Sequence, residues 1–154
     1  IYKVTQTPKS EFASFDNGTE MSAPKAAGTV TVEGKTNSQK LTFAWADSVS
    51  DVTIPAKYSA NGTQTDNAAS ITGDPGATAE FPFSIELEFP ANETIEEVVR
   101  TLKVTANGGQ AVQIAIKQAA GDAKLSVSPT EITIPQNGSA VSVTVTSNTS
   151  WTAA

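Results

Sequence analysis

Short segments that alternate apolar with polar residues recur along most of this chain, as expected of β-strands with one face in a core and the other in water. The clearest are residues 28–34 (GTVTVEG), 83–89 (FSIELEF), 100–106 (RTLKVTA), 111–118 (AVQIAIKQ) and 140–147 (AVSVTVTS). Residues 93–99 (ETIEEVV) are the one candidate helix, but this segment is short and leads directly into a strand. We therefore expect it to be a loop or a strand edge, and the chain to be all-β.

Turn signals separate these segments. Asn-Gly pairs begin at residues 17, 61, 107 and 137, and this dipeptide tolerates the positive φ angles of tight hairpin turns. The pair Asn107-Gly108 lies between LKVTA and VQIAIKQ, so we expect it to join residues 100–106 and 111–118 in a hairpin. Many short strands without a long helix predict a β-sandwich.

Two parts of the chain have similar sequences, which predicts repeated domains. Residues 19–37 align with residues 130–148 without a gap. The identical pairs are Thr19/Thr130, Glu20/Glu131, Pro24/Pro135, Val30/Val141, Val32/Val143 and Asn37/Asn148. Residues 2–6 (YKVTQ) also resemble residues 114–118 (IAIKQ), since each alternates and ends in Gln.

The alignment predicts three parts. We expect residues 1–7 to be the last strand of a preceding unit, residues 8–120 to be one complete unit, and residues 121–154 to be the truncated start of a following unit. Residues 124–154 contain too few strands to bury a core alone, so contact with the middle unit, with further sequence or with a partner chain should order them. Because an incomplete sandwich has open edges, a homo-oligomer or strand donation from another chain is an alternative.

Composition narrows the function classes. The 154 residues include 10 Lys and Arg and 16 Asp and Glu, and the basic residues are scattered singly, which argues against a nucleic-acid partner. The chain has no Cys and no His, so it has no thiolate nucleophile and lacks both the commonest general base and the usual zinc ligands. No apolar run approaches the roughly 18–20 residues that span a bilayer, so we expect no membrane span.

Acidic residues are frequent between residues 80 and 97, and a carboxylate pair for glycoside hydrolysis has to be considered. However, Glu86 and Glu88 alternate with Ile85, Leu87 and Phe89, which predicts that these glutamates face solvent on a strand. We therefore expect no enzyme activity and no cofactor.

Residues 57–79 form a long polar insertion in which Tyr58 lies beside SANGTQTDNAAS. An exposed aromatic ring near amide and hydroxyl groups suits a neutral sugar. The candidate ligand-binding residues are Tyr58, Asn61, Gln64, Asp66 and Asn67. The alternative is a variable loop without a ligand.

Two further ligand types can be weighed on particular residues. Asp66, Asn67 and Asp74 offer oxygen ligands for calcium, but their spacing fits no regular calcium loop, so we expect no metal. Trp45 and Trp151 could stack on sugars, yet a Trp early in a central strand of a sandwich is typically a core residue, and we expect both to pack inside.

Residues 124–151, KLSVSPTEITIPQNGSAVSVTVTSNTSW, resemble the opening of a BACON domain, the Bacteroidetes-associated module. That family begins with an L-x-V-x-P strand, a Gly-containing turn, a V-x-V strand and an S-N-x-x-W step. The middle unit resembles the other half of the pattern, with NET at residues 92–94, Arg100, LKVTA, a Gly turn and IAIKQ. It departs from the pattern by five extra residues between Asn37 and Trp45 and by the 57–79 insertion.

The resemblance implies a seven-stranded immunoglobulin-like sandwich that is repeated in, or appended to, surface proteins of gut Bacteroidetes or virion proteins of crAss-like phages. It implies an extracellular location on a bacterial cell surface or virion surface. The expected function is a non-enzymatic spacer or fibre module with neighbouring repeats as partners and adhesion to glycans or mucin. The alternative is a carbohydrate-binding module of a Bacteroidetes glycan-utilisation lipoprotein that uses the 57–79 loop.

Overall fold

The computed structural model describes residues 2–7, 9–71 and 79–154, and these contain strands but no helix. The strands are β1 (Ala13–Phe15), β2 (Glu20–Ala23), β3 (Gly28–Thr36), β4 (Leu41–Trp45), β5 (Lys57–Ala60), β6 (Thr63–Asp66), β7 (Phe81–Phe89), β8 (Val98–Ala106), β9 (Ala111–Gln118), β10 (Leu125–Ser128) and β11 (Thr144–Ser147). The expectation of an all-β protein is confirmed. No helix in the described part of the chain is long and apolar enough to cross a membrane.

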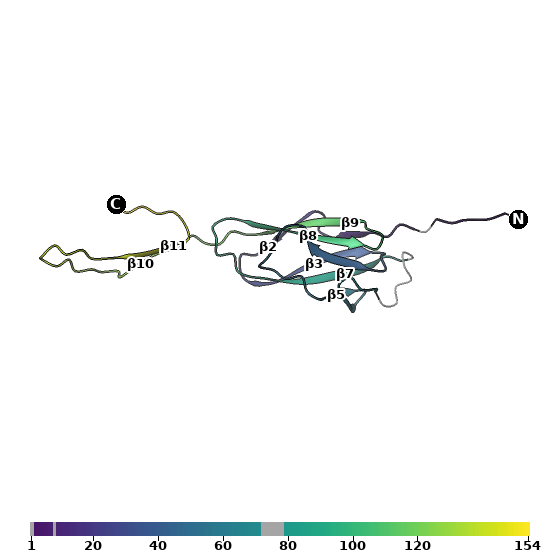
Figure 1. Cartoon of the computed structure of the whole chain (residues 1–154), viewed down its shortest axis with the longest axis horizontal. Coiled ribbons are helices and arrows are strands. Elements are labelled where there is room, and N and C mark those ends of the chain that lie inside the picture. Colours follow the sequence, from purple (N-terminus) through teal and green to yellow (C-terminus); the bar gives the residue numbers. More distant parts are fainter. Residues whose placement is uncertain (1, 8, 72–78) are drawn as a thin grey trace.

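Two sheets form the body of the molecule (Figure 1). One has the strand order β1-β3-β7-β5-β6 and the other has the order β2-β9-β8-β4. Every strand pair within them is antiparallel except β2 with β9, which is parallel. Apolar side chains from both sheets meet in one core, so this part of the chain is a β-sandwich.

The alternation along each strand decides which side chains enter this core. In β7, Phe83, Ile85 and Leu87 are buried, whereas Glu86 and Glu88 are exposed. Burying an apolar side chain of this size contributes about 1.5–3 kcal/mol relative to leaving it in water. The expectation that these two glutamates face solvent is confirmed.

The Asn-Gly pairs form turns of two kinds. Residues 100–106 and 111–118 pair as β8 and β9, as expected, but the positive φ angles fall at Gly108 (96°) and Gly109 (92°) and not at Asn107. The two-residue hairpin turn with both central residues at positive φ is Asn61 (49°) and Gly62 (77°), between β5 and β6.

Residues 57–66 are therefore not a loop, and the expectation for the first half of the 57–79 insertion was wrong. Strands β5 and β6 extend the five-stranded sheet, where Ser59 pairs with Ser84 and Ala60 with Phe83 of β7. The physical reason is the alternation of Tyr58 and Ala60, which are both buried, with polar neighbours. Asp74 lies outside the described residues.

Of three other segments, one is a loop as predicted and two contain less strand than expected. Residues 93–97 are a loop that leads into β8, as predicted. Only Thr144–Ser147 of the predicted strand 140–147 is a strand. Residues 2–7 are exposed and form no strand, because no described segment pairs with them.

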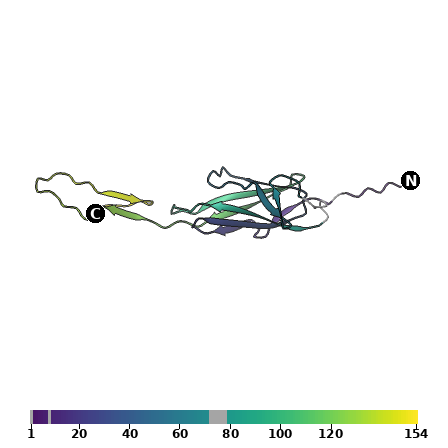
Figure 2. The same cartoon turned by 90° about the horizontal axis from the view of Figure 1, so that it is seen from below.

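Strands β10 and β11 form a separate two-stranded sheet. Figures 1 and 2 show it beyond one end of the sandwich, along the long axis of the molecule, whereas the N-terminal segment leaves from the other end. Residues 122–144 are all exposed, including the apolar Leu125, Val127, Ile132, Ile134, Val141 and Val143. This hairpin buries no core of its own.

The two tryptophans differ accordingly. Trp45 is half-buried, packs against the sandwich core and donates from Nε1 to the carbonyl oxygen of Val52 at 2.7 Å, so its predicted core role is confirmed. Trp151 is 50% exposed, and the expectation that it packs inside was wrong for this structure. The reason is that residues 121–154 contain no second sheet that could cover it.

Candidate functional site

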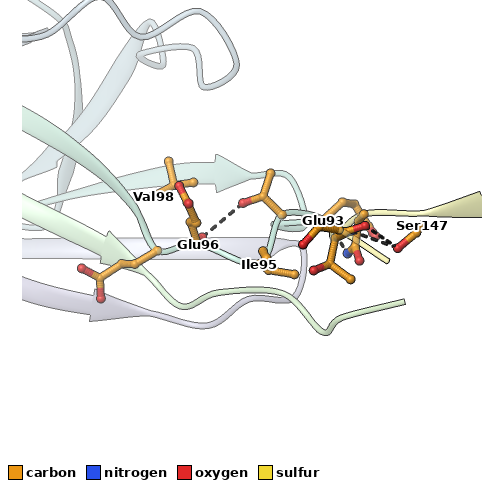
Figure 3. Close-up of a pocket in the computed structure, with 10 residues that line it drawn as sticks. Glu93, Ile95, Glu96, Val98 and Ser147 are labelled. Carbon is orange, nitrogen blue, oxygen red and sulfur yellow. Dashed lines mark hydrogen bonds between the residues drawn. The ribbon is translucent and has the colours of Figure 1, made fainter. Parts of the chain in front are cut away.

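A cleft lies where the sandwich meets the hairpin. Its volume is about 760 Å³, and loop 93–98 forms one wall while residues 147–150 form the other (Figure 3). We call this region, together with Lys25 and residues 121–124, the junction.

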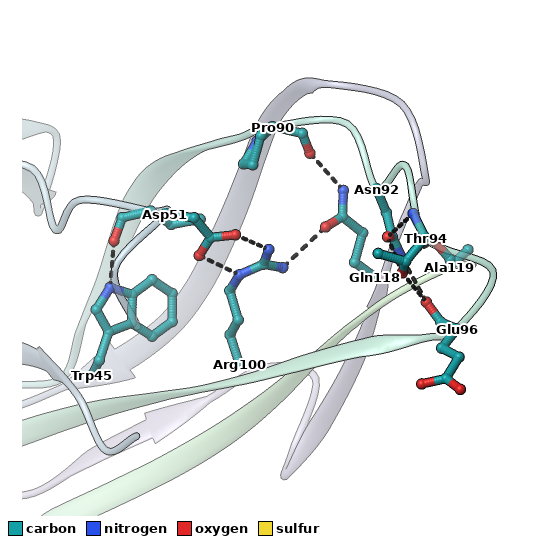
Figure 4. Close-up of polar contacts among 10 residues, drawn as sticks. Trp45, Asp51, Pro90, Asn92, Thr94, Glu96, Arg100, Gln118 and Ala119 are labelled. Carbon is teal, nitrogen blue, oxygen red and sulfur yellow. Dashed lines mark hydrogen bonds and ion pairs between the residues drawn. The ribbon is translucent and has the colours of Figure 1, made fainter. Parts of the chain in front are cut away.

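Loop 92–97 is held by the side chain of Asn92, which is only 8% exposed. Its Oδ1 accepts hydrogen bonds from the backbone N–H of Thr94 (3.0 Å) and from the Thr94 hydroxyl (2.7 Å). Its Nδ2 donates to the carbonyl oxygens of Glu96 (2.7 Å) and Ala119 (3.0 Å), as Figure 4 shows. All the polar atoms of this side chain are satisfied, so the loop has one well-defined conformation.

The linker that leaves β9 is fitted closely to this loop. The N–H of Gly121 donates to the carbonyl oxygen of Thr94 at 2.7 Å. A Cβ atom on Gly121 would overlap the carbonyl oxygen of Asn92, so only glycine fits here without displacing backbone.

Polar contacts connect the hairpin to the sandwich on both of its strands. Lys25 pairs with Asp122 at 2.5 Å and Lys124 pairs with Glu93 at 2.6 Å, and all four side chains are exposed. The Lys25 ammonium lowers the pKa of Asp122, and the Glu93 carboxylate raises the pKa of Lys124. From the second strand, Asn148 Nδ2 donates to the backbone oxygen of Glu93 at 3.0 Å.

A compact set of hydrogen bonds, which we call the Asn37 latch, joins the ends of β1 and β3. The buried Asn37 accepts from the N–H of Phe12 (2.8 Å) and donates to the carbonyl oxygen of Ser10 (3.1 Å). The hydroxyl of Thr36 donates to the Phe12 carbonyl oxygen (2.6 Å) and accepts from the N–H of Ser38 (2.9 Å).

The same set occurs at the ends of β10 and β11, where we call it the Asn148 latch. Asn148 accepts from the N–H of Lys124 (2.7 Å) and donates to the carbonyl oxygen of Asp122 (2.8 Å). The hydroxyl of Ser147 donates to the Lys124 carbonyl oxygen (2.9 Å) and accepts from the N–H of Thr149 (3.0 Å). Each donor and acceptor of the Asn37 latch thus has a counterpart in the Asn148 latch.

The strand pairs beside the latches also correspond. Phe15 is opposite Gly34 in the β1–β3 pair, and Val127 is opposite Val145 in the β10–β11 pair. A Cβ at Gly34 would overlap the ring of Phe83, which itself packs edge-on against Phe15. A large residue opposite glycine in one pair is therefore replaced by two residues of intermediate size in the other.

A second polar network joins the buried Arg100 and Gln118 of the sandwich to the half-exposed carboxylate of Asp51 (Figure 4). Arg100 is 4% exposed, and its Nε and Nη2 donate to the carboxylate of Asp51 at 3.1 and 2.5 Å. Its Nη1 donates to Gln118 Oε1 (3.0 Å), Gln118 Nε2 donates to the carbonyl oxygen of Pro90 (2.8 Å), and the guanidinium lies 4.8 Å from the Phe89 ring centroid. Each nitrogen of the Arg100 guanidinium donates a hydrogen bond, and these bonds join segments that are distant in the sequence.

Tyr58 does not present a face to solvent, and that expectation was wrong. Its side chain is 2% exposed and its ring packs on Phe43 with 4.8 Å between centroids. The hydroxyl has no hydrogen-bond partner, and burial raises the pKa of Tyr58 to about 12. The polar residues that follow Tyr58 in the sequence led to the expectation of an exposed ring. Its position in the alternating strand β5 instead directs the ring into the core.

Asn67 is engaged by the backbone of a strand edge. Its Oδ1 accepts from the N–H of Phe43 (2.8 Å) and its Nδ2 donates to the carbonyl oxygen of Phe43 (3.0 Å). The N–H of the next residue, Ala68, donates to the carbonyl oxygen of Leu41 (3.0 Å). The side chain thus covers the edge of β4, and its amide is already satisfied.

Asn61, Gln64 and Asp66 are exposed on the β5–β6 hairpin, and a ligand-binding role for them stays a prediction. Asp66 pairs with Lys57 at 2.8 Å. The nearby hollow, which Gln64 helps to line, measures about 80 Å³, well below the roughly 300–1,000 Å³ of typical ligand pockets. Among the residues that the structure describes, no group of three or more acidic side chains could hold a metal ion.

Sequence reasoning found the Asn37/Asn148 identity but assigned it no role, because the bonding partners are backbone atoms. Asn92 and Arg100 entered only as parts of a resemblance. The signal that could have identified the latches is the recurrence of a hydroxyl residue directly before Asn, as Thr36-Asn37 and Ser147-Asn148.

No protein-family model matches the chain, and no curated protein matches it. Among solved structures, a Bacteroides ovatus GH5 xyloglucanase in complex with a XXXG heptasaccharide is similar, with a TM-score of 0.39 and 13% sequence identity. The similarity covers 73% of this chain and 19% of that chain. A TM-score this low supports no conclusion about function.

Proposed function

We propose that this chain is a segment of a tandem array of immunoglobulin-like sandwiches and acts as a spacer or fibre module of a larger extracellular protein. The observation that carries the proposal is the double occurrence of the latch, at Asn37 within the sandwich and at Asn148 in the hairpin.

The two latches share more than a residue type. Each uses one Asn amide and one neighbouring hydroxyl to bind the backbone of the segment that leads into the first strand, which is β1 or β10. Donor and acceptor have the same roles in each corresponding pair of hydrogen bonds. The change from Phe15 and Gly34 to Val127 and Val145 preserves volume between the paired strands. These features support the interpretation that β10 and β11 begin a second sandwich of the same kind.

The arrangement of the two parts suits a spacer. The hairpin continues the long axis of the sandwich, and the N-terminal segment leaves at the opposite end (Figures 1 and 2). A nine-residue strand such as β7 is about 30 Å long at roughly 3.3 Å per residue. Each further unit in this arrangement would lengthen the array, and weak contacts along it would add through effective concentration.

We place the array on a bacterial cell surface or a virion, with neighbouring repeats as its partners. This location depends on the resemblance of residues 92–118 and 124–151 to BACON domains. Strand donation between chains remains the alternative way to complete the second unit, because the edges of β10 and β11 are open.

A segment exchange tests the repeat directly. Residues 12–38 of the sandwich are replaced by residues 124–149 with glycine kept at the position of Gly34, because a Cβ there would overlap the Phe83 ring. One set of apolar residues then takes the place of another. Leu125, Val127, Ile134, Val141 and Val143 then occupy the positions of Ala13, Phe15, Ala23, Val30 and Val32.

We expect the exchanged protein to unfold cooperatively and to keep a dispersed amide spectrum. The matched control carries the sequence of residues 124–149 in shuffled order, which preserves composition and removes the alternation. If the exchanged protein were as disordered as this control, residues 124–149 would not be the start of an equivalent unit.

The glycan-binding alternative now depends on the exposed residues of the β5–β6 hairpin. Calorimetry with mucin-derived glycans and plant polysaccharides should give no binding heat for a spacer. A heat that disappears in Gln64→Ala and persists in Thr31→Ala, which removes an exposed side chain of β3, would favour the carbohydrate-binding module instead.

A further inference from the structure

We propose that loop 92–97 and Lys25 form a docking surface that holds the start of the following unit in one fixed orientation, so that successive units are coupled stiffly. This inference rests on the proposed array, because it assigns the partner of that surface as the next repeat.

The docking surface is held by hydrogen bonds within the sandwich that do not involve the hairpin. The Asn92 side chain fixes the loop through bonds to Thr94, Glu96 and Ala119, and the N–H of Asn92 donates to the carbonyl oxygen of Lys25 at 2.8 Å. Two backbone oxygens at this surface, those of Glu93 and Thr94, accept hydrogen bonds from the hairpin side of the junction. A preorganised surface loses little conformational entropy when it binds.

The hairpin is attached at two separate points. The linker before β10 binds through the Gly121 N–H, and the segment after β11 binds through Asn148. A single covalent linker would act as a hinge, whereas contacts from both strands remove that freedom of rotation.

Asn148 couples folding of the next unit to its docking. Its Nδ2 donates both to Asp122, within the Asn148 latch, and to Glu93 of the sandwich. In the Asn37 latch the corresponding Nδ2 donates to Ser10, and among the described residues it has no second acceptor. The same amide group therefore stabilises both the first strand pair of the next unit and its contact with the sandwich.

Two ion pairs flank these bonds, and they belong to this junction in particular. The positions that correspond to Asp122 and Lys124 in the middle unit are Ser10 and Phe12, which carry no charge. Because Lys25, Asp122, Lys124 and Glu93 are exposed, salt screens their attraction. The backbone contacts set the orientation, and the charges add a salt-sensitive contribution.

Nitrogen-15 relaxation on the 154-residue chain tests the coupling. If the hairpin is docked, amides of β10 and β11 tumble with the same correlation time as amides of β8 and β9. Gly121→Ala should lower the correlation time of the hairpin amides, because the new Cβ displaces the linker from the Asn92 carbonyl. Gly28→Ala is the matched control, since its Cβ meets no atom within 4 Å.

Hydrogen exchange at the backbone amide of Lys124, which donates to Asn148, distinguishes a failure of the docking from a failure of the proposed repeat. Hairpin amides that tumble faster than the sandwich, while the Lys124 amide stays protected from exchange, would overturn the docking and leave a flexible array. A Lys124 amide that exchanges as in an unfolded chain, together with a disordered segment-exchange protein, would overturn the repeat itself. Equal hairpin correlation times in Gly121→Ala and Gly28→Ala would also contradict the docking.

Discussion

Replacing Asn37 by alanine removes the centre of the latch that closes the first strands of the sandwich. The amide is fully buried and makes one bond as acceptor, from Phe12, and one as donor, to Ser10. Both partners are backbone groups, so the substitution takes a hydrogen bond from the N–H of Phe12 and from the carbonyl oxygen of Ser10.

The expected cost follows from these two bonds. Each contributes about 0.5–1.5 kcal/mol net, and a buried partner left unsatisfied adds a desolvation penalty, so we expect Asn37→Ala to cost about 2–4 kcal/mol. This is a large part of the roughly 5–15 kcal/mol that stabilises a typical domain. With a urea m-value of about 2 kcal/mol/M, in the middle of the usual range, the midpoint should fall by about 1–2 M.

The assay is urea unfolding followed by the fluorescence of Trp45 in a Trp151→Phe background, because Trp151 is half-exposed in the segment after β11 and would add an unrelated signal. Asn148→Ala is the matched control, since it breaks the corresponding bonds outside the sandwich. Its effect on the sandwich should stay within about 0.5 kcal/mol.

Asn37→Asp distinguishes hydrogen bonding from shape. It keeps the volume and the acceptor for Phe12 but presents a second acceptor to the Ser10 carbonyl and buries a charge. We expect it to destabilise at least as much as Asn37→Ala. An Asn37→Ala protein with the same midpoint as Asn148→Ala would refute the view that the latch stabilises the sandwich.

Three further outcomes are expected. Gly34→Ala should cost about 1–3 kcal/mol in the same urea assay, because its Cβ would overlap the carbonyl oxygen of Ser14 and the Phe83 ring; an unchanged midpoint would contradict this packing. Arg100 lowers the pKa of Asp51, so this pair stabilises the fold above the unfolded pKa of about 3.9 and its contribution is lost as pH falls through the lower folded value. Thermal unfolding across acid pH should therefore show a shallower slope for Asp51→Asn than for the native chain, and equal slopes would contradict it. Tyr58→Phe removes a buried hydroxyl without a partner, so it should leave stability at pH 7 equal or slightly higher. The native chain should also lose more stability than Tyr58→Phe as pH rises from about 10 towards about 12, and a decline of equal size in both would refute the assigned pKa.

The strands of the sandwich were largely predictable, because alternation is a local property of the chain. In segments such as 83–89 and 111–118 the alternation of apolar and polar residues predicts which side chains enter the core, and the observed burial follows that pattern. The prediction failed for residues 57–66, where a polar composition concealed the alternation of Tyr58 and Ala60. The assignment of residues 1–7 to the last strand of a preceding unit stays a prediction, since a strand requires a neighbour and alternation alone does not supply one.

The junction and the latches were less predictable. The sequence shows that Asn37 and Asn148 correspond, but their partners are backbone atoms of Ser10, Phe12, Asp122 and Lys124, whose identity leaves no trace in a side-chain pattern. The need for Gly121 was equally hidden, because it arises from the carbonyl group of Asn92, on the far side of the β8–β9 hairpin in the sequence.

By itself the sequence determined the all-β class, the main strands with their buried and exposed faces, and the correspondence between residues 19–37 and 130–148. These follow from local periodicity and from similarity along the chain, which need no knowledge of distant contacts. Only the tertiary structure decided that Tyr58 lies inside, that Asn67 covers the edge of β4, and that Arg100 pairs with Asp51. Each of these depends on which segments the two packed sheets bring together, and a side chain's nearest neighbours in sequence do not specify that.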